Sequence, residues 1–172
     1  LRFFGMPILP PLETHDGKPA TYGDLAGKVV ALYFSAEWCP ACSSFTPMLH
    51  ALYDEAKDDG AIPFEIIFVS SDNDAAAQES YMEKEHGEWL RVPFGAPERE
   101  ELKASHGAFA GKEKSKFPNA TRESGIPTLV IIGADGTKKA HIDCDYGAPG
   151  VTLLKRKGVR LLDEWKQFAW PS

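Results

Sequence analysis

The hydrophobic pattern in the first half of the chain predicts a strand, a helix and a second strand. Val29–Phe34 and Phe64–Ser70 are runs of almost uninterrupted apolar residues, which is typical of strands buried on both faces. Between these runs, apolar residues recur at helical spacing: Phe45, Met48, Leu49, Leu52 and Tyr53. A helix over Cys42–Asp59 would join the two strands as a parallel, right-handed crossover.

The rest of the chain predicts further strands and helices in the same domain. A chain of 172 residues can bury roughly 70% of its unfolded surface, and we expect a single domain over residues 1–172. The expected elements are a hairpin within Ile8–Lys18 that turns at Asp16–Gly17, helices Ala75–Lys84 and Glu98–Ser105, a strand Leu129–Ile132 in a hairpin with Lys138–Asp143, and a last helix with Leu161, Leu162, Trp165 and Phe168.

Two cysteines, Cys39 and Cys42, lie between the first buried strand and the helix that follows it. At a helix N-terminus, free backbone N–H groups and the positive end of the helix dipole stabilise a thiolate, and thiols in such motifs have pKa values of roughly 3.5 to 7.5 instead of about 8.5. We therefore expect Cys39 to be the nucleophile. Cys42, about one turn further along, would resolve a mixed disulfide by attacking the sulfur of Cys39.

Two other interpretations of this pair are half of a zinc site and a structural disulfide. A zinc site needs four ligands, and the sequence offers no second Cys-x-x-Cys or His-x-x-x-His pair. The third cysteine, Cys144, stands between Asp143 and Asp145, whose negative charges should raise the pKa of its thiol. We expect Cys144 to be an incidental surface thiol, and we expect no metal or organic cofactor besides the redox-active Cys39–Cys42 disulfide.

A second motif, Gly125–Thr128, precedes the strand Leu129–Ile132. Pro127 stands at the start of this strand, where a proline removes no hydrogen bond that the sheet needs. On its own, this proline would be an ordinary strand start with a trans peptide bond, because only about one in twenty X-Pro bonds in folded proteins is cis.

Taken together, these segments resemble the thioredoxin superfamily, and within it the tryparedoxin and nucleoredoxin branch, from about Gly17 to Pro171. The residues that carry the resemblance are Tyr33–Ala36, Trp38–Pro40, Phe45–Pro47, Phe64–Glu65, Ser70–Asp72, Trp89–Leu90, Val92–Phe94 and Gly125–Thr128. The resemblance implies an α/β thioredoxin-like fold, with a central mixed β-sheet flanked by helices and the N-terminal hairpin as an extension. It also implies a cis Ile126–Pro127 bond that faces the dithiol.

The same resemblance implies residue roles and an activity. Trp38 would form an exposed lip over the thiols and would bind the substrate together with Pro40, Ala41, Ile126 and Pro127. The implied activity is that of a tryparedoxin-like thiol–disulfide oxidoreductase, which reduces protein disulfides such as those of peroxiredoxin-type peroxidases. Its electrons would come from a low-molecular-weight dithiol, trypanothione or glutathione, or from a reductase. Two alternatives stay open: a nucleoredoxin-like regulatory module with redox-dependent partner binding, and an oxidase or isomerase of an oxidising compartment.

The sequence departs from this family in ways that bear on the site. Ala41 replaces the second proline of the usual Cys-Pro-Pro-Cys motif, and Tyr33 stands where most thioredoxins, though not the tryparedoxin branch, have a buried aspartate. An apparent insertion covers residues 106–124, and we expect this long loop to be disordered or partner-specific. Its basic residues are either solvated or a docking patch for an acidic partner: Lys112, Lys114, Lys116 and Arg122.

Charge and composition limit the choice of partners and location. A formal net charge of −6 argues against general nucleic-acid binding, and no stretch of the sequence is long and apolar enough to span a membrane. The first residues show neither an initiator methionine nor the apolar core of a signal peptide, so the native targeting cannot be read from them. Three cysteines, two of them in one motif, do not make the disulfide scaffold of a secreted protein. We therefore expect a reducing compartment, the cytoplasm, and a monomer that binds neither nucleic acid nor membranes.

Overall fold

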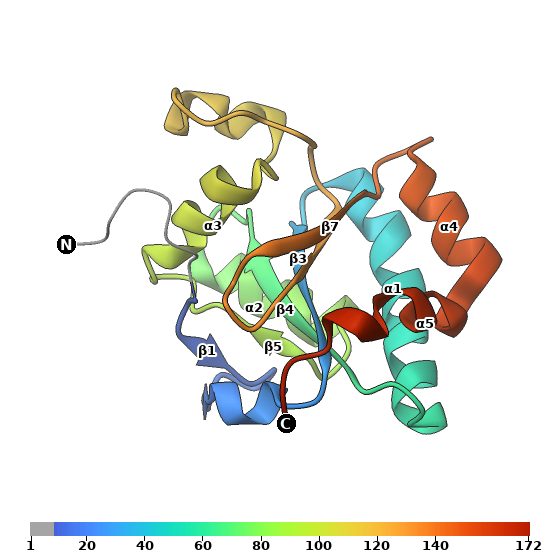
Figure 1. The fold of residues 1–172 in the computed structure, drawn as a ribbon. Coiled ribbons are helices and arrows are strands. Elements are labelled where there is room, and N and C mark those ends of the chain that lie inside the picture. The colour runs from blue at the N-terminus through green and yellow to red at the C-terminus, as the bar shows by residue number, and fades with distance from the viewer. Residues whose placement is uncertain (1–8) are drawn as a thin grey trace.

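Within residues 9–172, the part of the chain that the computed structural model describes, seven strands form one mixed sheet in the order β2-β1-β5-β4-β3-β6-β7 (Figure 1). The strands are β1 (Leu12–Glu13), β2 (Pro19–Ala20), β3 (Val29–Ser35), β4 (Phe64–Ser70), β5 (Leu90–Arg91), β6 (Thr128–Ile132) and β7 (Lys138–Asp143). The α-helices are α1 (Pro40–Asp59), α2 (Ala75–Glu85), α3 (Glu98–His106), α4 (Pro149–Lys157) and α5 (Leu161–Trp165), and the 3₁₀ helices are η1 (Tyr22–Leu25), η2 (Gly111–Lys116), η3 (Gly158–Arg160) and η4 (Lys166–Phe168).

The two faces of the sheet bury different helices, because successive side chains of a strand point to opposite faces. Ala31 and Tyr33 of β3 pack in one core with α1, α2 and α5. Leu32 and Phe34 pack in the other core with α3 and with residues of the segment 106–124. Every residue of β3 and β4 is buried, as the sequence predicts. The result is the α/β architecture with a central mixed sheet that the sequence predicts.

Strand β3 holds the centre of the sheet and sets the position of the two motifs. It pairs in parallel with β4 and antiparallel with β6, with Phe34 opposite both Val69 and Thr128. Since β3 runs antiparallel to β6, the end of β3 lies beside the start of β6. The chain that follows β3 and the chain that precedes β6 therefore meet at one edge of the sheet.

Most of the predicted elements are confirmed. Strands β4 and β7 have the predicted bounds, and helices α1, α2 and α3 agree within two residues. The hairpin pairs β1 with β2, so its second strand falls just after the predicted range, while Ile8 and the first residues of the chain lie outside the described part. Strand β5 and helix α4 were not predicted, because β5 has only two residues and α4 buries little apart from Leu154.

Residues 106–124 were expected to be disordered or partner-specific, and the structure contradicts the first of these two expectations. Residues 108–110 are at most 4% exposed, and the ring of Phe109 packs against that of Phe117, with 4.8 Å between their centres. Ala108 and Ser124 form a short parallel bridge. Since this segment buries apolar side chains in the core under the sheet, it is part of the folded unit.

Gly107 closes the base of this segment. Its φ of +64° lies in the left-handed region that favours glycine, and a Cβ atom there would collide with the carbonyl oxygen of Thr121. The carbonyl oxygen of Gly107 accepts hydrogen bonds from the backbone N–H groups of Glu123 (2.8 Å) and Ser124 (3.1 Å). A glycine at 107 thus ends α3 and lets the returning chain pass close to it.

A buried ion pair ties the same segment to α3. The Nζ atom of Lys103 lies 2.9 Å from Oε1 of Glu113, and their side chains are 0% and 4% exposed. Lys103 also lies 2.9 Å from the partly exposed Glu100. The other carboxylate oxygen of Glu113 accepts hydrogen bonds from Ser71 Oγ (2.8 Å) and from the backbone N–H of Ala110 (3.0 Å). Both oxygens of Glu113 therefore have the partners that a buried charge requires.

We expect Glu113→Gln to lower the free energy of unfolding by about 3 kcal/mol, because removing one partner leaves the other charge buried and poorly compensated. Urea unfolding followed by circular dichroism measures the change. Glu88→Gln is the matched control, since Glu88 pairs with Lys57 on the surface, where the side chains are 82% and 60% exposed, and should cost less than about 1 kcal/mol. Equal losses in the two variants would contradict a stabilising role for the buried pair.

Candidate active site

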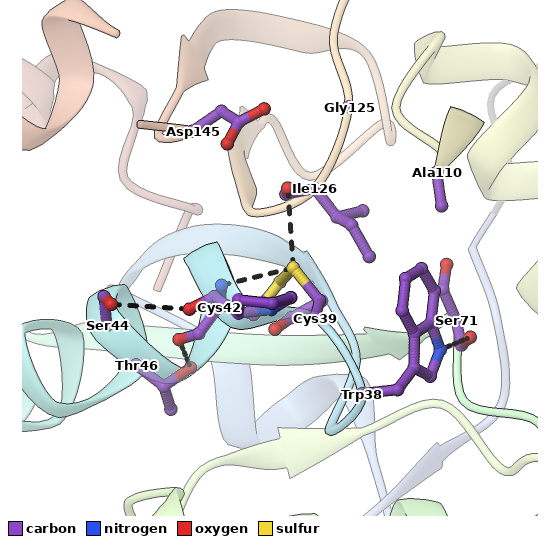
Figure 2. Close-up of a disulfide and its surroundings, with 12 residues drawn as sticks. Trp38, Cys39, Cys42, Ser44, Thr46, Ser71, Ala110, Gly125, Ile126 and Asp145 are labelled. Carbon is purple, nitrogen blue, oxygen red and sulfur yellow. Dashed lines mark hydrogen bonds between the residues drawn. A yellow bond between two sulfur atoms is a disulfide. The ribbon is translucent and has the colours of Figure 1, made fainter. Parts of the chain in front are cut away.

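The two cysteines lie at the first turn of α1. Cys39 is the N-cap residue, Pro40 follows at the start of the helix, and the backbone N–H of Cys42 donates to the Sγ atom of Cys39 at 3.2 Å. The structure joins the two sulfur atoms as a disulfide, with 5.2 Å between the Cα atoms (Figure 2). Cys39 is 5% exposed and Cys42 is 0% exposed. Cys39 is thus the outer cysteine, with a helix N-terminus directed at its sulfur.

The loop before β6 lies directly beside Cys39. The Ile126–Pro127 peptide bond is cis, as the resemblance implied, and the carbonyl oxygen of Ile126 lies 3.7 Å from Sγ of Cys39 (Figure 2). The backbone N–H of Cys144 donates to the carbonyl oxygen of Pro127 at 3.1 Å, which fixes the loop from the other side. The structure therefore brings together the two motifs that are 87 residues apart in the sequence.

An open groove of about 310 Å³ runs past Cys39. Trp38, Pro40, Ala41 and Ile126, four of the five residues predicted to bind the substrate, line this groove. Pro127 does not line it and is buried behind Ile126.

Trp38 forms the exposed edge of this groove. Its side chain is 37% exposed, and its indole N–H donates to the carbonyl oxygen of Ser71 at 2.9 Å (Figure 2). This contact fixes the ring beside the dithiol while one side stays open to solvent. The position agrees with the exposed lip that the resemblance implied.

Residues that the sequence did not assign to the site complete the groove. They come from the segment 106–124, from the loop before β6 and from the chain after β7: Ala110, Gly111, Arg122, Gly125, Asp145 and Tyr146. Arg122 belongs to the basic residues that the sequence had singled out, but no local pattern indicates that this segment returns to the dithiol.

A cluster of hydroxyl groups lies under the first turns of α1. The hydroxyl groups of Tyr33 and Thr46 are 2.8 Å apart, those of Thr46 and Tyr81 2.5 Å, and those of Tyr81 and Ser35 2.8 Å. Thr46 also donates to the carbonyl oxygen of Cys42 at 2.8 Å. Burial raises the pKa of Tyr81 to about 12 and that of Tyr33 well above its usual value. These groups are therefore neutral at physiological pH and anchor the inner cysteine's turn by hydrogen bonds.

The expectation that Cys144 is a surface thiol is wrong. Its side chain is 1% exposed, and it lies where β7 ends and the chain passes over the core. Burial is the main cause that raises the pKa of this thiol, and the nearby Asp143 carboxylate raises it further. The sequence therefore predicts correctly that the pKa of the Cys144 thiol is raised, but it does not indicate that burial is the main cause. Because the thiol is buried, it is shielded from reagents in the solvent.

Within residues 9–172, no three His, Cys, Asp or Glu side chains are grouped to hold a metal ion. No helix in the same part of the chain is long and apolar enough to cross a lipid bilayer.

Comparison with known proteins agrees with this geometry. The sequence profile of the thioredoxin-like family matches residues 27–137. The chain belongs to this family. The thioredoxin-like domain is 35% identical over 163 residues to "Probable nucleoredoxin 1" of Arabidopsis thaliana, an alignment that covers 91% of this chain but only 25% of that relative. The chain therefore spans about a quarter of the length of that nucleoredoxin.

Solved structures place the thioredoxin-like domain near the tryparedoxins. Tryparedoxin from Trypanosoma brucei superposes with a TM-score of 0.62 at 30% identity, and the match covers 95% of this chain and 94% of that one. A tryparedoxin II complexed with glutathionylspermidine gives a TM-score of 0.57 at 27% identity, with coverage of 97% and 96%. The domain thus belongs to the nucleoredoxin/tryparedoxin branch, and Cys39 and Cys42 are its Cys-x-x-Cys redox pair.

We expect Cys39 to be the cysteine that reacts first after reduction. In the folded protein at pH 7, brief treatment with iodoacetamide should label Cys39 on the order of tenfold or more faster than Cys42 or Cys144, because only Cys39 combines a helix N-terminus with access from the groove. Peptide mass spectrometry measures the labelling at each site. Unfolding in urea is the control and should make all three thiols react alike. Preferential labelling of Cys42 in the folded protein would contradict the assignment.

Proposed function

We propose that this domain is a thiol–disulfide oxidoreductase that reduces protein disulfides through Cys39 and Cys42. The observation that carries the proposal is the position of Cys39 Sγ, at the N-terminus of α1 and 3.7 Å from the Ile126 carbonyl oxygen in an open groove. An extended substrate in this groove would lie along the Ile126 backbone with its disulfide at Cys39. Trp38, Pro40 and Ala41 would contact the substrate. Pro127, which is buried and does not line the groove, would hold the shape of the loop that carries Ile126.

The reaction that fits this geometry has two exchange steps. The thiolate of Cys39 attacks one sulfur of the substrate disulfide, which forms a mixed disulfide and releases the other substrate sulfur as a thiolate. The thiolate of Cys42 then attacks Sγ of Cys39, which forms the Cys39–Cys42 disulfide and releases the second substrate thiolate. Two electrons pass from the enzyme to the substrate, and the released thiolates take up protons according to their pKa values. Cys42 is fully buried, which keeps it from competing for the first attack.

A low-molecular-weight dithiol is the electron donor that we propose, with glutathione or a reductase as the other choices. The support is the similarity to a tryparedoxin II that was solved in complex with glutathionylspermidine. Oxidised peroxiredoxin-type peroxidases are the proposed substrates. Such a cycle needs a reducing compartment, and the cytoplasm is the location that we propose.

A second candidate is a nucleoredoxin-like regulatory module whose main task is to bind a partner according to its redox state. The 35% identity to a nucleoredoxin that is about four times as long as the aligned region favours this candidate. Both candidates need the dithiol, but only the oxidoreductase needs repeated turnover. An assay with trypanothione, glutathione and thioredoxin reductase offered in parallel, with an oxidised peroxiredoxin as acceptor, separates them. Sustained turnover with any donor supports the oxidoreductase, and a single reduction without turnover supports the regulatory module.

We expect Cys42→Ser to trap substrates as mixed disulfides on Cys39, because the attack that releases the product is lost. Pull-down under non-reducing conditions and release by dithiothreitol measure the trapped proteins. Cys144→Ser is the matched control and should trap nothing while it keeps its turnover, since Cys144 is buried away from the groove. Turnover by Cys42→Ser at the rate of the unaltered domain would contradict the two-cysteine mechanism.

A further inference from the structure

The segment 106–124 forms one wall of the dithiol groove. Ala110, Gly111 and Arg122 line the groove together with Cys39, and Figure 2 shows Ala110 across from Ile126, on the side of Trp38. Because Glu113 and Gly107 hold this segment to α3 and to its own base, the wall has a defined position. A substrate that reaches Cys39 therefore passes residues of this segment.

Two positive charges of the segment lie at the groove. The Nζ atom of Lys112 lies 3.6 Å from the centre of the Trp38 ring and 3.1 Å from the neutral Oδ1 atom of Asn73. The Nε–H group of Arg122 donates to the carbonyl oxygen of Phe109 at 2.8 Å. Within residues 9–172 neither side chain forms an ion pair, but Arg122 has an acidic neighbour: a Cβ atom at Gly125 would lie 2.7 Å from Nη2 of Arg122 and 3.9 Å from Oδ2 of Asp145. The charge of Lys112 is thus available to a bound partner, whereas that of Arg122 is partly balanced by Asp145.

The acidic residues of the segment are paired elsewhere. Glu113 pairs with Lys103 in the interior, and Glu123 lies 2.6 Å from Lys138 on β7. Asp145 lines the groove from the chain after β7 and lies near Arg122. On a chain with a net charge of −6, the positive charge beside Trp38 is therefore that of Lys112.

We propose that Lys112, which lies over the Trp38 ring, selects protein disulfides whose cysteine is flanked by acidic residues, and that the acidic residues of the substrate lie on the Trp38 side of the groove. This proposal rests on the proposed function and adds to it the charge of the substrate. Charge complementarity at the edge of an interface raises the association rate and suppresses partners of the wrong charge. The recognised partner is an acidic polypeptide segment around the disulfide.

Exposed aromatic side chains favour a polypeptide as the partner. Trp38 is 37% exposed and Tyr146 is 67% exposed, and both line the groove. Tryptophan, tyrosine and arginine are the residue types that most often dominate protein–protein binding energy. Lys112 lies over the Trp38 ring but does not line the groove, so a partner that contacts it extends beyond the dithiol.

The test compares two synthetic peptides that share one internal disulfide and differ only in the residues next to the cysteines, which are Glu in one and Lys in the other. The enzyme is reduced, freed of reductant and mixed with each peptide, so that one enzyme dithiol and one peptide disulfide give one enzyme disulfide and one peptide dithiol. We expect the Glu peptide to react about fivefold faster, as one exposed ion pair allows. The preference should weaken when the salt concentration rises from 0.05 M to 0.5 M, because salt screens exposed charges.

Three variants assign the preference to Lys112. Lys112→Glu should remove the preference for the Glu peptide, and Lys112→Arg should keep it because it retains the charge over Trp38. Arg122→Glu should weaken the preference less than Lys112→Glu does, because Asp145 lies near Arg122. Lys166→Glu is the matched control, since Lys166 is exposed beside the C-terminal chain that pairs with Lys28 at the far end of β3, and it should also keep the preference. Equal rates for the two peptides, or a preference that Lys112→Glu retains, would overturn the proposal.

Two further substrates separate this proposal from the proposed function and from a small-molecule site. The neutral reagent 4,4′-dithiodipyridine should oxidise the unaltered enzyme and the Lys112 and Lys166 variants at the same rate, since neither residue lines the groove. Failure of the unaltered enzyme with this reagent would contradict the oxidoreductase function itself. Glutathione disulfide carries carboxylates without a protein. If Lys112→Glu changed the rate with glutathione disulfide but not with the peptides, Lys112 would bind a small anionic disulfide, and the proposal of a protein partner would fall.

Discussion

The antiparallel pairing of β3 with β6 is the interaction on which the site depends. It sets Phe34 opposite Thr128, so the chain that leaves β3 and the chain that enters β6 meet at one edge of the sheet. The chain that leaves β3 carries Cys39 to the N-terminus of α1, and the chain that enters β6 brings the carbonyl oxygen of Ile126 to 3.7 Å from the sulfur of Cys39. Because β3 is central and buried on both faces, the reactive thiol follows directly on a fully packed strand.

The sequence predicts the parts of this arrangement that depend on local patterns. Strands β3 and β4 are continuous apolar runs, and the apolar residues of α1 recur at helical spacing. The bounds of these three elements could therefore be predicted to within two residues. The part of the groove lined by Arg122 and Asp145 could not be predicted. These residues come from chain segments without a periodic pattern, and only tertiary packing brings them to the site. The prediction that Cys144 is exposed failed for a similar reason. The aspartates on both sides of Cys144 favour a surface position, but its thiol is buried in the core at the end of β7.

The segment 106–124 shows how charge can conceal burial in a sequence. Its alternating lysines and Glu113 are typical of a solvated loop, yet Glu113 is the inward residue and pairs with the fully buried Lys103. A lysine in the middle of α3 gives no sign in the sequence that a glutamate ten residues later will neutralise it. The same pair holds the turn that carries Gly111 and Lys112 beside Trp38, so a feature that stabilises the fold also positions a charge next to the groove.

The hydroxyl cluster under α1 decides how the inner cysteine can lose its proton. An aspartate at position 33 could act as a base there, but Tyr33 and Tyr81 are phenols whose pKa values burial raises, to about 12 for Tyr81. A phenol that holds its proton up to such pH values can donate or relay a hydrogen bond but cannot remove a proton from a thiol near pH 7. The hydroxyl group of Thr46 donates its hydrogen bond to the carbonyl oxygen of Cys42 and so offers no base to the thiol. The proton of Cys42 therefore passes to water or to the thiolate that the substrate releases in the first exchange step. Transfer to that thiolate would couple activation of the resolving cysteine to the arrival of a substrate.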